Sequence, residues 1–188
     1  MEPRSKSLPN VVAAVAFTAA VVTLGYVMLG LMPMLLFALG FVGGLGLWLL
    51  IPKRSSFTRI KVPYFVALGL FVVHKLEERF LDFFPALSQI TGVPTPATDS
   101  LLVYLLYALA ACWLLIPWLV SRGADFGYFL AWTFFTSLGV IELAHFVFPF
   151  FRDEPYGYFP GMASVVLLAP AAWWGMWRLS HPPAPSEA

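Results

Sequence analysis

Charged residues are scarce in this chain. Of its 188 residues, 11% are Asp, Glu, Lys or Arg and 60% are hydrophobic, whereas a soluble globular domain carries about 25% charged residues. So little charge cannot cover a water-facing surface, which excludes both a soluble domain and an intrinsically disordered chain. The net charge of +1 gives no strong attraction to nucleic acid, so we expect no nucleic-acid partner. The remaining class is an integral membrane protein, whose partner is the lipid bilayer.

Cysteine is almost missing as well. The single cysteine, Cys112, lies inside an apolar run. One thiol excludes an intrachain disulfide and a cysteine-based metal site, and we expect Cys112 to be a small apolar core residue. Any chemistry must therefore come from ionisable residues within the apolar segments.

Six apolar segments are long enough to cross a membrane, which takes roughly 20 residues. We therefore expect an all-α integral membrane bundle of six transmembrane helices. It forms a single domain over residues 11–178, between a polar N-terminal tail (1–10) and a Pro-rich tail (179–188). A turn through Gly30 and Pro33 separates the first two spans, and a loop from Pro85 to Ser100 follows the third. The expected spans cover residues 11–29, 34–51, 62–84, 101–120, 127–148 and 161–177.

The basic residues predict the orientation. Six spans put both termini on one side, and the side that is richer in Lys and Arg faces the cytoplasm. Arg152 is the one basic residue outside the spans that lies on the other side. We therefore expect cytoplasmic N and C termini, in a bacterial inner (plasma) membrane. The basic residues on the cytoplasmic side are Arg4, Lys6, Lys53, Arg54, Arg59, Lys61, Arg122 and Arg178.

Ionisable residues inside the spans are concentrated in two of the six. Such residues are costly in a membrane and usually face a cavity or a partner. A helix turns by about 100° per residue, so the His and two Glu residues of the H-x-x-E-E segment lie on one face of the third span. The two ionisable residues of the fifth span are three positions apart and also share a face of their helix. At about 1.5 Å per residue, both groups lie in the outer half of the bilayer. We expect one joint pocket formed by His74, Glu77, Glu78, Glu142 and His145.

This pocket predicts a metal site. His74 and Glu78 have the i, i+4 spacing at which two residues of one helix hold one metal ion. His145, or alternatively Glu142, completes three ligands with a fourth position open. Glu77 is the expected general base, and Glu142 is a second catalytic carboxylate. We expect a divalent metal ion, zinc or iron, as cofactor, with a dinuclear iron site as a further option. The predicted function is hydrolysis or oxidation of a lipophilic substrate by a membrane-embedded enzyme.

Other interpretations of the same residues stay open. Without a metal, histidines and glutamates in a dry pocket serve as acid and base for a lipid isomerase or cyclase. The pocket could instead carry protons or a cation in a transporter, or hold helices together. Several further polar residues are expected to be structural. These are Lys75, Arg79 and Asp82 as a paired or snorkelling group, Thr133, Thr136 and Ser137 as helix-packing hydroxyls, and Asp153 and Glu154 in a solvated loop.

The segment His74-Lys75-Leu76-Glu77-Glu78 resembles the membrane family named for its H-x-x-E-E motif, the HXXEE domain. The later residues Glu142 and His145, the Tyr158-Phe159-Pro160-Gly161 turn and the last helix are similar to the second half of that family. The resemblance covers about residues 64–177 and implies a site at His74, Glu77, Glu78 and His145 without naming a reaction. A second likeness, of His74 and Glu78 in a helix bundle, is to the emopamil-binding protein superfamily of sterol isomerases. It implies the isomerase alternative.

Overall fold

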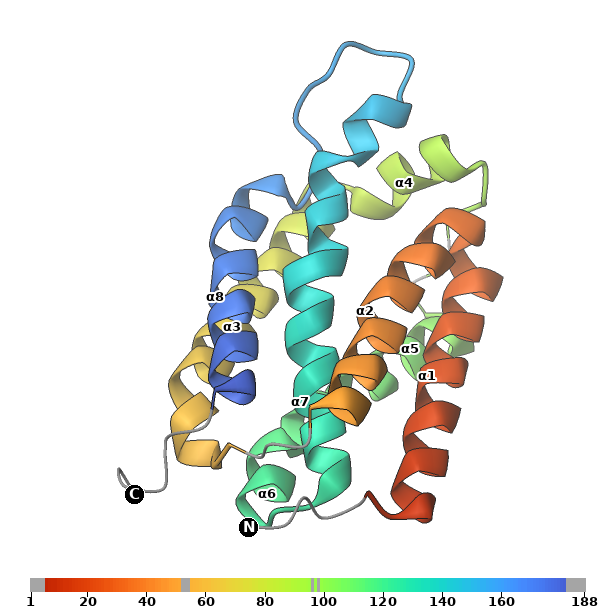
Figure 1. Cartoon of the computed structure of the whole chain (residues 1–188). Helices are drawn as coiled ribbons and strands as arrows, with labels where there is room; N and C mark the ends of the chain where they lie inside the picture. Colours follow the sequence, from red (N-terminus) through yellow and green to blue (C-terminus); the bar gives the residue numbers. More distant parts are fainter. Residues whose placement is uncertain (1–5, 52–54, 96, 98, 182–188) are drawn as a thin grey trace.

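The regular elements of the described chain are all helical (Figure 1). The computed structural model describes residues 6–51, 55–95, 97 and 99–181, so Arg4, Lys53, Arg54 and parts of both predicted tails lie outside the described residues. The elements are α1 (Leu8–Leu29), α2 (Leu31–Leu50), α3 (Phe57–Phe80), α4 (Phe83–Thr91), α5 (Leu101–Ala111), η1 (Cys112–Leu115), α6 (Ile116–Ser121), α7 (Asp125–Thr136), η2 (Ser137–Ile141), η3 (Glu142–Phe146), η4 (Phe148–Phe151) and α8 (Met162–Ser180).

Among the described residues, five helical segments are long and apolar enough to cross a membrane. They are α1, α2, α3, the run Leu101–Ser121 and the run Asp125–Phe146. The sixth expected span corresponds to α8, which has 19 residues but is not among the five. The tryptophans and Arg178 of α8 lower its mean hydropathy. The helix nevertheless belongs to the bundle, because it packs against α3 and α7. The structure therefore shows an all-helical bundle with five candidate spans.

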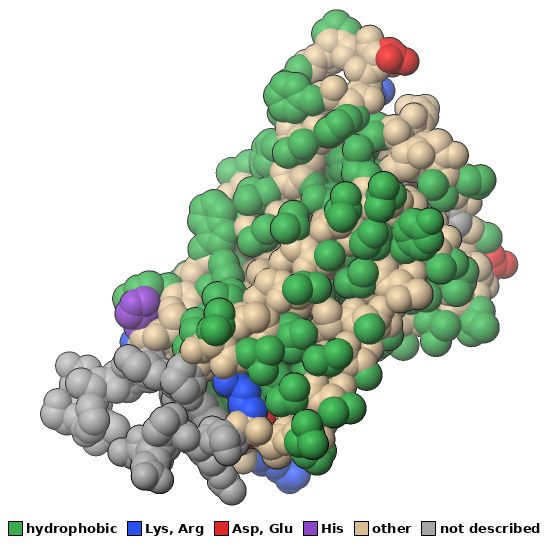
Figure 2. All heavy atoms as spheres, turned by 45° about the vertical axis from the view of Figure 1, so that its right-hand side comes forward, with side chains coloured by type: hydrophobic (Ala, Val, Ile, Leu, Met, Phe, Trp, Pro, Cys, Tyr) green, Lys and Arg blue, Asp and Glu red, His purple; other side chains and the backbone are tan. Residues whose placement is uncertain are grey.

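Hydrophobic side chains cover the outside of this bundle. Large apolar residues are exposed along α1, α2, α3 and α5. Figure 2 shows them spread over one face, with the few charged side chains in view at its ends and edges. Water would not tolerate so continuous an apolar surface, whereas lipid would. The surface agrees with the composition in indicating an integral membrane protein.

Two prolines stand near helix starts rather than in the turns predicted for them. Pro33 lies in the first turn of α2, and Pro85 lies in the first turn of α4. The first turn tolerates proline because its N–H groups have no partner within the helix. The turn before α2 is therefore a single residue, Gly30, whose φ of +88° suits glycine. Likewise, a helix from Phe83 to Thr91 occupies much of the segment from Pro85 to Ser100 that was predicted to be a loop.

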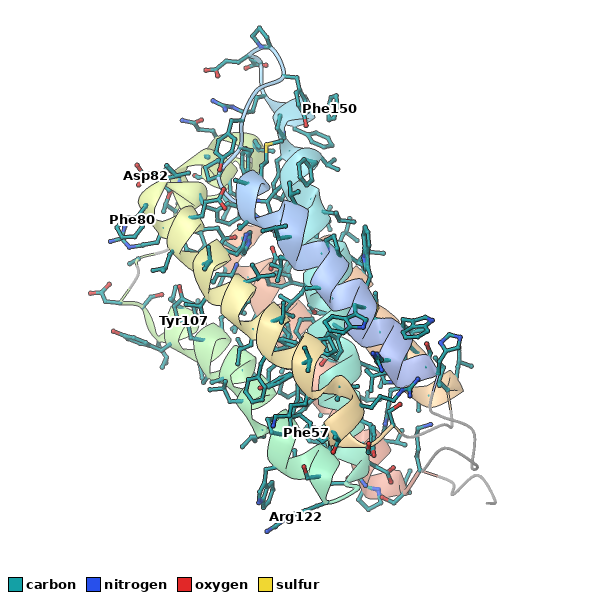
Figure 3. The ribbon with its side chains drawn as sticks, turned by 90° about the vertical axis from the view of Figure 1, so that its left-hand side faces the viewer. Phe57, Phe80, Asp82, Tyr107, Arg122 and Phe150 are labelled. Atoms are coloured by element: carbon teal, nitrogen blue, oxygen red, sulfur yellow. The ribbon has the colours of Figure 1, made fainter. Side chains whose placement is uncertain are left out.

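The chain bends sharply between α3 and α4. Asp82 adopts a left-handed conformation with φ 56°, which Asp tolerates better than most residues. Figure 3 shows Phe80 and Asp82 at this corner, and α4 then runs across the end of the bundle (Figure 1). The third span therefore ends at Phe80, four residues earlier than expected.

The helix α7 forms the centre of the fold. Every residue from Gly127 to Gly139 is buried, because α2, α6 and α8 pack around α7. Small residues allow this close approach: a Cβ at Gly44 would lie 2.8 Å from the Thr133 Cα, and one at Gly175 would lie 2.1 Å from Phe135. Elements that continue from α7 are thus held rigidly from several sides.

Candidate metal centre

Four of the five predicted pocket residues come together. His74, Glu78, Glu142 and His145 each offer one ligand atom, and these atoms all lie within 4.8 Å of one another. The His74 Nε2 atom lies 3.1 Å from Glu142 Oε2, which joins α3 to η3. The proximity of the two ionisable clusters, predicted from the sequence, is confirmed. The arrangement is a group that could hold a metal ion.

The local backbone places these side chains in pairs. On α3, the i, i+4 spacing puts His74 Nε2 3.1 Å from Glu78 Oε1. The other pair stands on the 3₁₀ helix η3, where His145 Nε2 lies 3.3 Å from Glu142 Oε2. Directly before η3, the chain makes the π-helical turn η2. Such turns are rare and often occur at functional sites, because the extra residue redirects the side chains that follow.

Each imidazole ring forms a hydrogen bond through its Nδ1 atom to a residue outside the four-residue cluster. His145 Nδ1 lies 2.5 Å from the carbonyl oxygen of Pro160, which can only accept, so this nitrogen donates. His74 Nδ1 lies 2.8 Å from Ser164 Oγ. The Ser164 hydroxyl donates to the Gly161 carbonyl oxygen, which leaves it to accept from His74. Both Nε2 atoms therefore point into the cluster, in the outer hydrogen-bonding arrangement typical of metal-ligating histidines.

The centre of the cluster requires positive charge. Each Nε2 atom faces carboxylate oxygens at 3.1–3.4 Å. Lone pairs on both sides would repel, so either a proton on each Nε2 or a cation between the four atoms must bind them. A tetrahedral ion with bonds of about 2.0–2.1 Å holds its ligand atoms about 3.3 Å apart. The four histidine–carboxylate distances therefore suit a bound metal ion as well as hydrogen bonds, while the ligand atoms of the group as a whole lie within 4.8 Å of one another.

Glu77, the expected general base, is not part of this group. Its carboxylate accepts hydrogen bonds from the backbone N–H groups of Gly161, Ala163 and Ser164, at 3.1, 3.1 and 2.8 Å. These N–H groups belong to the first turn of α8, where the helix dipole favours an anion. Tyr158 also donates its hydroxyl hydrogen to Glu77. The carboxylate thus ties the C-terminal end of α3 to the turn between residues 158 and 164.

This turn contacts both histidines. Gly161 has a φ of +99°, and a Cβ there would lie 2.4 Å from His145 Cε1 and 2.8 Å from His74 Cε1. Pro160 and Ser164 supply the acceptors for the two Nδ1 atoms. Partial burial and the hydrogen bond to Glu77 raise the pKa of Tyr158 to about 12. Sequence reasoning missed the role of this turn, although its Tyr-Phe-Pro-Gly signal was visible.

Lys75 contacts the cluster rather than a partner at the end of α3. Its Nζ atom lies 2.6 Å from Glu78 Oε2 and 3.8 Å from Glu142 Oε1. Lys75 was expected to snorkel or to pair with Arg79 and Asp82. Within the described residues, its ion pairs are instead with Glu78 and Glu142. Each carboxylate presents one oxygen to the histidines and the other toward Lys75. The lysine thus completes a charged cluster of five side chains.

An apolar cavity of about 210 Å³ opens beside the cluster. Lys75, Glu78, Glu142 and His145 form its polar wall. Ser137, expected to be a packing hydroxyl, lines the cavity too; it is buried, and its Oγ has no hydrogen-bond partner in the described part of the chain. The apolar walls come mainly from α1, α2, α3, α4, α5 and η1, and include Met28, Phe37, Phe41, Phe71, Phe83, Leu87, Val103, Leu106 and Trp113.

Comparisons with protein-family models, curated proteins and solved structures find no match to this chain. The chemistry must therefore be argued from the site itself. Two imidazole nitrogens, two carboxylates and an ammonium group stand at one end of an apolar cavity. Such a set can bind a cation, transfer protons and stabilise negative charge on a ligand.

Proposed function

We propose that this protein is a membrane-embedded, metal-dependent hydrolase that acts on a lipophilic substrate. One observation carries the proposal: two histidines, each held through Nδ1, direct Nε2 toward two carboxylates on the wall of an apolar cavity. Proteins rarely leave a buried hydroxyl without a partner, because it costs about 1–3 kcal/mol. The free Ser137 hydroxyl in this cavity therefore supports a ligand-binding role.

The proposal includes a bundle of six transmembrane helices with cytoplasmic termini, in which α8 is the sixth span. The start of α1 and the end of α8 lie at the same end of the bundle (Figure 1). The basic residues Lys6, Arg59, Lys61, Arg122 and Arg178 precede, begin or end helices at that end. Arg152 follows η4 at the opposite end, near the site. This distribution supports our proposal that the site lies in the outer half of the bilayer of a bacterial inner membrane.

We assign His74, Glu78 and His145 as the metal ligands. Two histidines and one glutamate form a catalytic zinc set that leaves a fourth position open. Glu78 is preferred to Glu142 as the third ligand because it shares a continuous α-helix with His74. When bound, the metal would make its water ligand more acidic and polarise a carbonyl oxygen.

The other side chains of the cluster then take the remaining roles. Glu142 would accept a proton from the attacking water, since its Oε2 atom lies 3.1 and 3.3 Å from the two Nε2 atoms that would hold the metal. The water oxygen adds to the carbonyl carbon of an ester or amide, and the bond to the alcohol or amine breaks after Glu142 returns the proton to it. The Lys75 ammonium stabilises the negative charge that develops on the carbonyl oxygen. The products are a carboxylic acid and an alcohol or amine.

Elemental analysis of the purified chain tests the metal. We expect about one zinc or iron per chain in the wild type, and a large loss of metal in His74→Ala and His145→Ala, because each loses a ligand. The matched control is His181→Ala, which removes an exposed histidine at the far end of α8 and should keep the metal. Wild-type protein that is active, metal-free and indifferent to added zinc, iron or manganese would exclude the metal.

A metal-free lipid isomerase is the second candidate, and one observation favours it. If each Nε2 carries a proton, the same four contacts become imidazolium–carboxylate hydrogen bonds. The cluster would then shuttle protons to and from a lipid in the cavity. Activity that survives chelators and is lost in both Glu78→Gln and Glu142→Gln would identify this mechanism.

A further inference from the structure

The charged groups that face the cavity do not balance. Glu78 and Glu142 together carry two negative charges. The cation that their contacts with the histidines require, one divalent metal ion or two protons, supplies two positive charges, and Lys75 adds a third. Glu77 does not enter this count, because its carboxylate faces three backbone N–H groups of the α8 terminus and does not line the cavity. The polar wall thus has one excess positive charge, whichever cation is bound.

Lys75 is where this excess charge can be reached. Its side chain is 37% exposed and lines the cavity, with Nζ 5.1 Å from the centre of the Phe71 ring. One of its three N–H groups donates to Glu78. Glu142 Oε1, at 3.8 Å, is too far for a hydrogen bond. Among the described residues the other two N–H groups have no acceptor, so they are available to a ligand.

The remaining walls restrict the shape of that ligand. They are apolar and come from several helices, so they suit a hydrocarbon chain. At the outer end, α4 lies across the bundle (Figure 1) and contributes Phe83, Phe84 and Leu87 to the lining. A small head group with two oxygens and one negative charge matches both the two free N–H groups and the excess charge.

We propose that the cavity binds a single-chain carboxylate lipid, with its carboxylate on Lys75 and its chain along the apolar walls. The inference extends the proposed function, since such an acid is what hydrolysis of an acyl ester or amide releases. It does not depend on the metal, because the charge count is the same with two protons. A carboxylate in this position forms charge-assisted hydrogen bonds in an environment of low dielectric constant, where they are strong.

The test compares three ligands with the same chain and different head groups. Equilibrium dialysis of the purified full-length protein in detergent measures binding of dodecanoate, dodecanol and dodecyltrimethylammonium, with zinc content determined in the same samples. We expect dodecanoate to bind about 10-fold or more tightly than dodecanol, and the ammonium ligand to bind most weakly. Equal affinities for dodecanoate and dodecanol in the wild type would overturn the proposal without any variant.

Variants locate the carboxylate. Lys75→Met keeps the apolar stem but removes the charge, so it should abolish the preference for dodecanoate, whereas Lys75→Arg should retain most of it. The matched control is Arg122→Met, which removes an exposed cation at the other end of the molecule (Figure 3) and should change nothing. A preference that persists in Lys75→Met would refute the assignment. A wild type that prefers dodecanoate but holds no metal would refute the hydrolase and leave this site standing.

Discussion

Replacing Glu77 by Gln separates the structural role found here from the catalytic role predicted from the motif. The carboxylate accepts three backbone N–H groups at the start of α8 and the Tyr158 hydroxyl. Gln retains one acceptor oxygen, but it brings an NH₂ group against these donors and loses the charge that the helix dipole favours. Loss of a capping interaction costs about 0.5–2 kcal/mol, and loss of hydrogen bonds to a charged group costs about 1.5–3 kcal/mol.

We therefore expect Glu77→Gln to destabilise the protein by about 1–3 kcal/mol, which lowers the unfolding temperature by roughly 2–12 °C for a chain of this size. The turn that Glu77 holds also positions both histidines, so zinc affinity should fall by about 10- to 100-fold, as when outer-shell partners of metal ligands are lost. Thermal unfolding and zinc competition with a chelator measure the two effects in detergent.

The matched control for this variant is Glu154→Gln. Glu154 pairs with Arg152 on an exposed loop, where ion pairs contribute about 0–1 kcal/mol. It should leave both stability and zinc affinity near the wild-type values. If Glu77→Gln instead unfolds at the wild-type temperature, keeps full zinc affinity and has lost its turnover, Glu77 is the general base and the structural interpretation is wrong.

Three further predictions follow from the same geometry. Gly161→Ala should destabilise the fold and reduce zinc binding, because its φ of +99° and the 2.4 Å approach to His145 leave no room for a Cβ; zinc binding like that of the wild type would contradict this. Zinc should displace the protons between the histidines and carboxylates, so about two protons should be released per ion and zinc affinity should rise with pH. Calorimetry in buffers of different ionisation enthalpy measures this proton release. Zinc binding without any proton release would exclude the site. In a Cys112→Ser background, a cysteine at Ser56 should be protected from an impermeant reagent in intact cells and one at Thr95 labelled; the reverse pattern would overturn the orientation.

Local periodicity in the sequence was enough to predict the paired ligands. The spacing i, i+4 of His74 and Glu78, and i, i+3 of Glu142 and His145, fixes the relative directions of side chains within one helix. The cost of burying such groups in lipid then implies that the two pairs meet, and the short distances between them agree. The apolar runs likewise predicted α1 and α2 to within a few residues at each end.

The roles of Glu77 and Lys75 could not be read in the same way. On a helical wheel, Glu77 and Glu78 lie on opposite sides of His74, separated by about 100°. Which carboxylate meets the second pair depends on which element packs on each side of α3, and this is a property of the tertiary fold. Lys75 points still further round the helix, but its long flexible stem brings Nζ back to Glu78. The π-helical turn η2, which begins at the cavity-lining residue Ser137, has no simple sequence signal either.

The C-terminal end of α3 thus joins fold and chemistry through neighbouring side chains. Glu77 fastens α3 to the start of α8, while His74 and Glu78 fasten it to η3 through Glu142 and His145. The turn that Glu77 holds in turn positions His74 and His145. Substitutions at these residues should therefore change stability and metal binding together. Lys75 differs, because its hydrogen bond is to Glu78 of its own helix and its approach to Glu142 of η3 is longer, at 3.8 Å, so its substitution should change ligand binding more than stability.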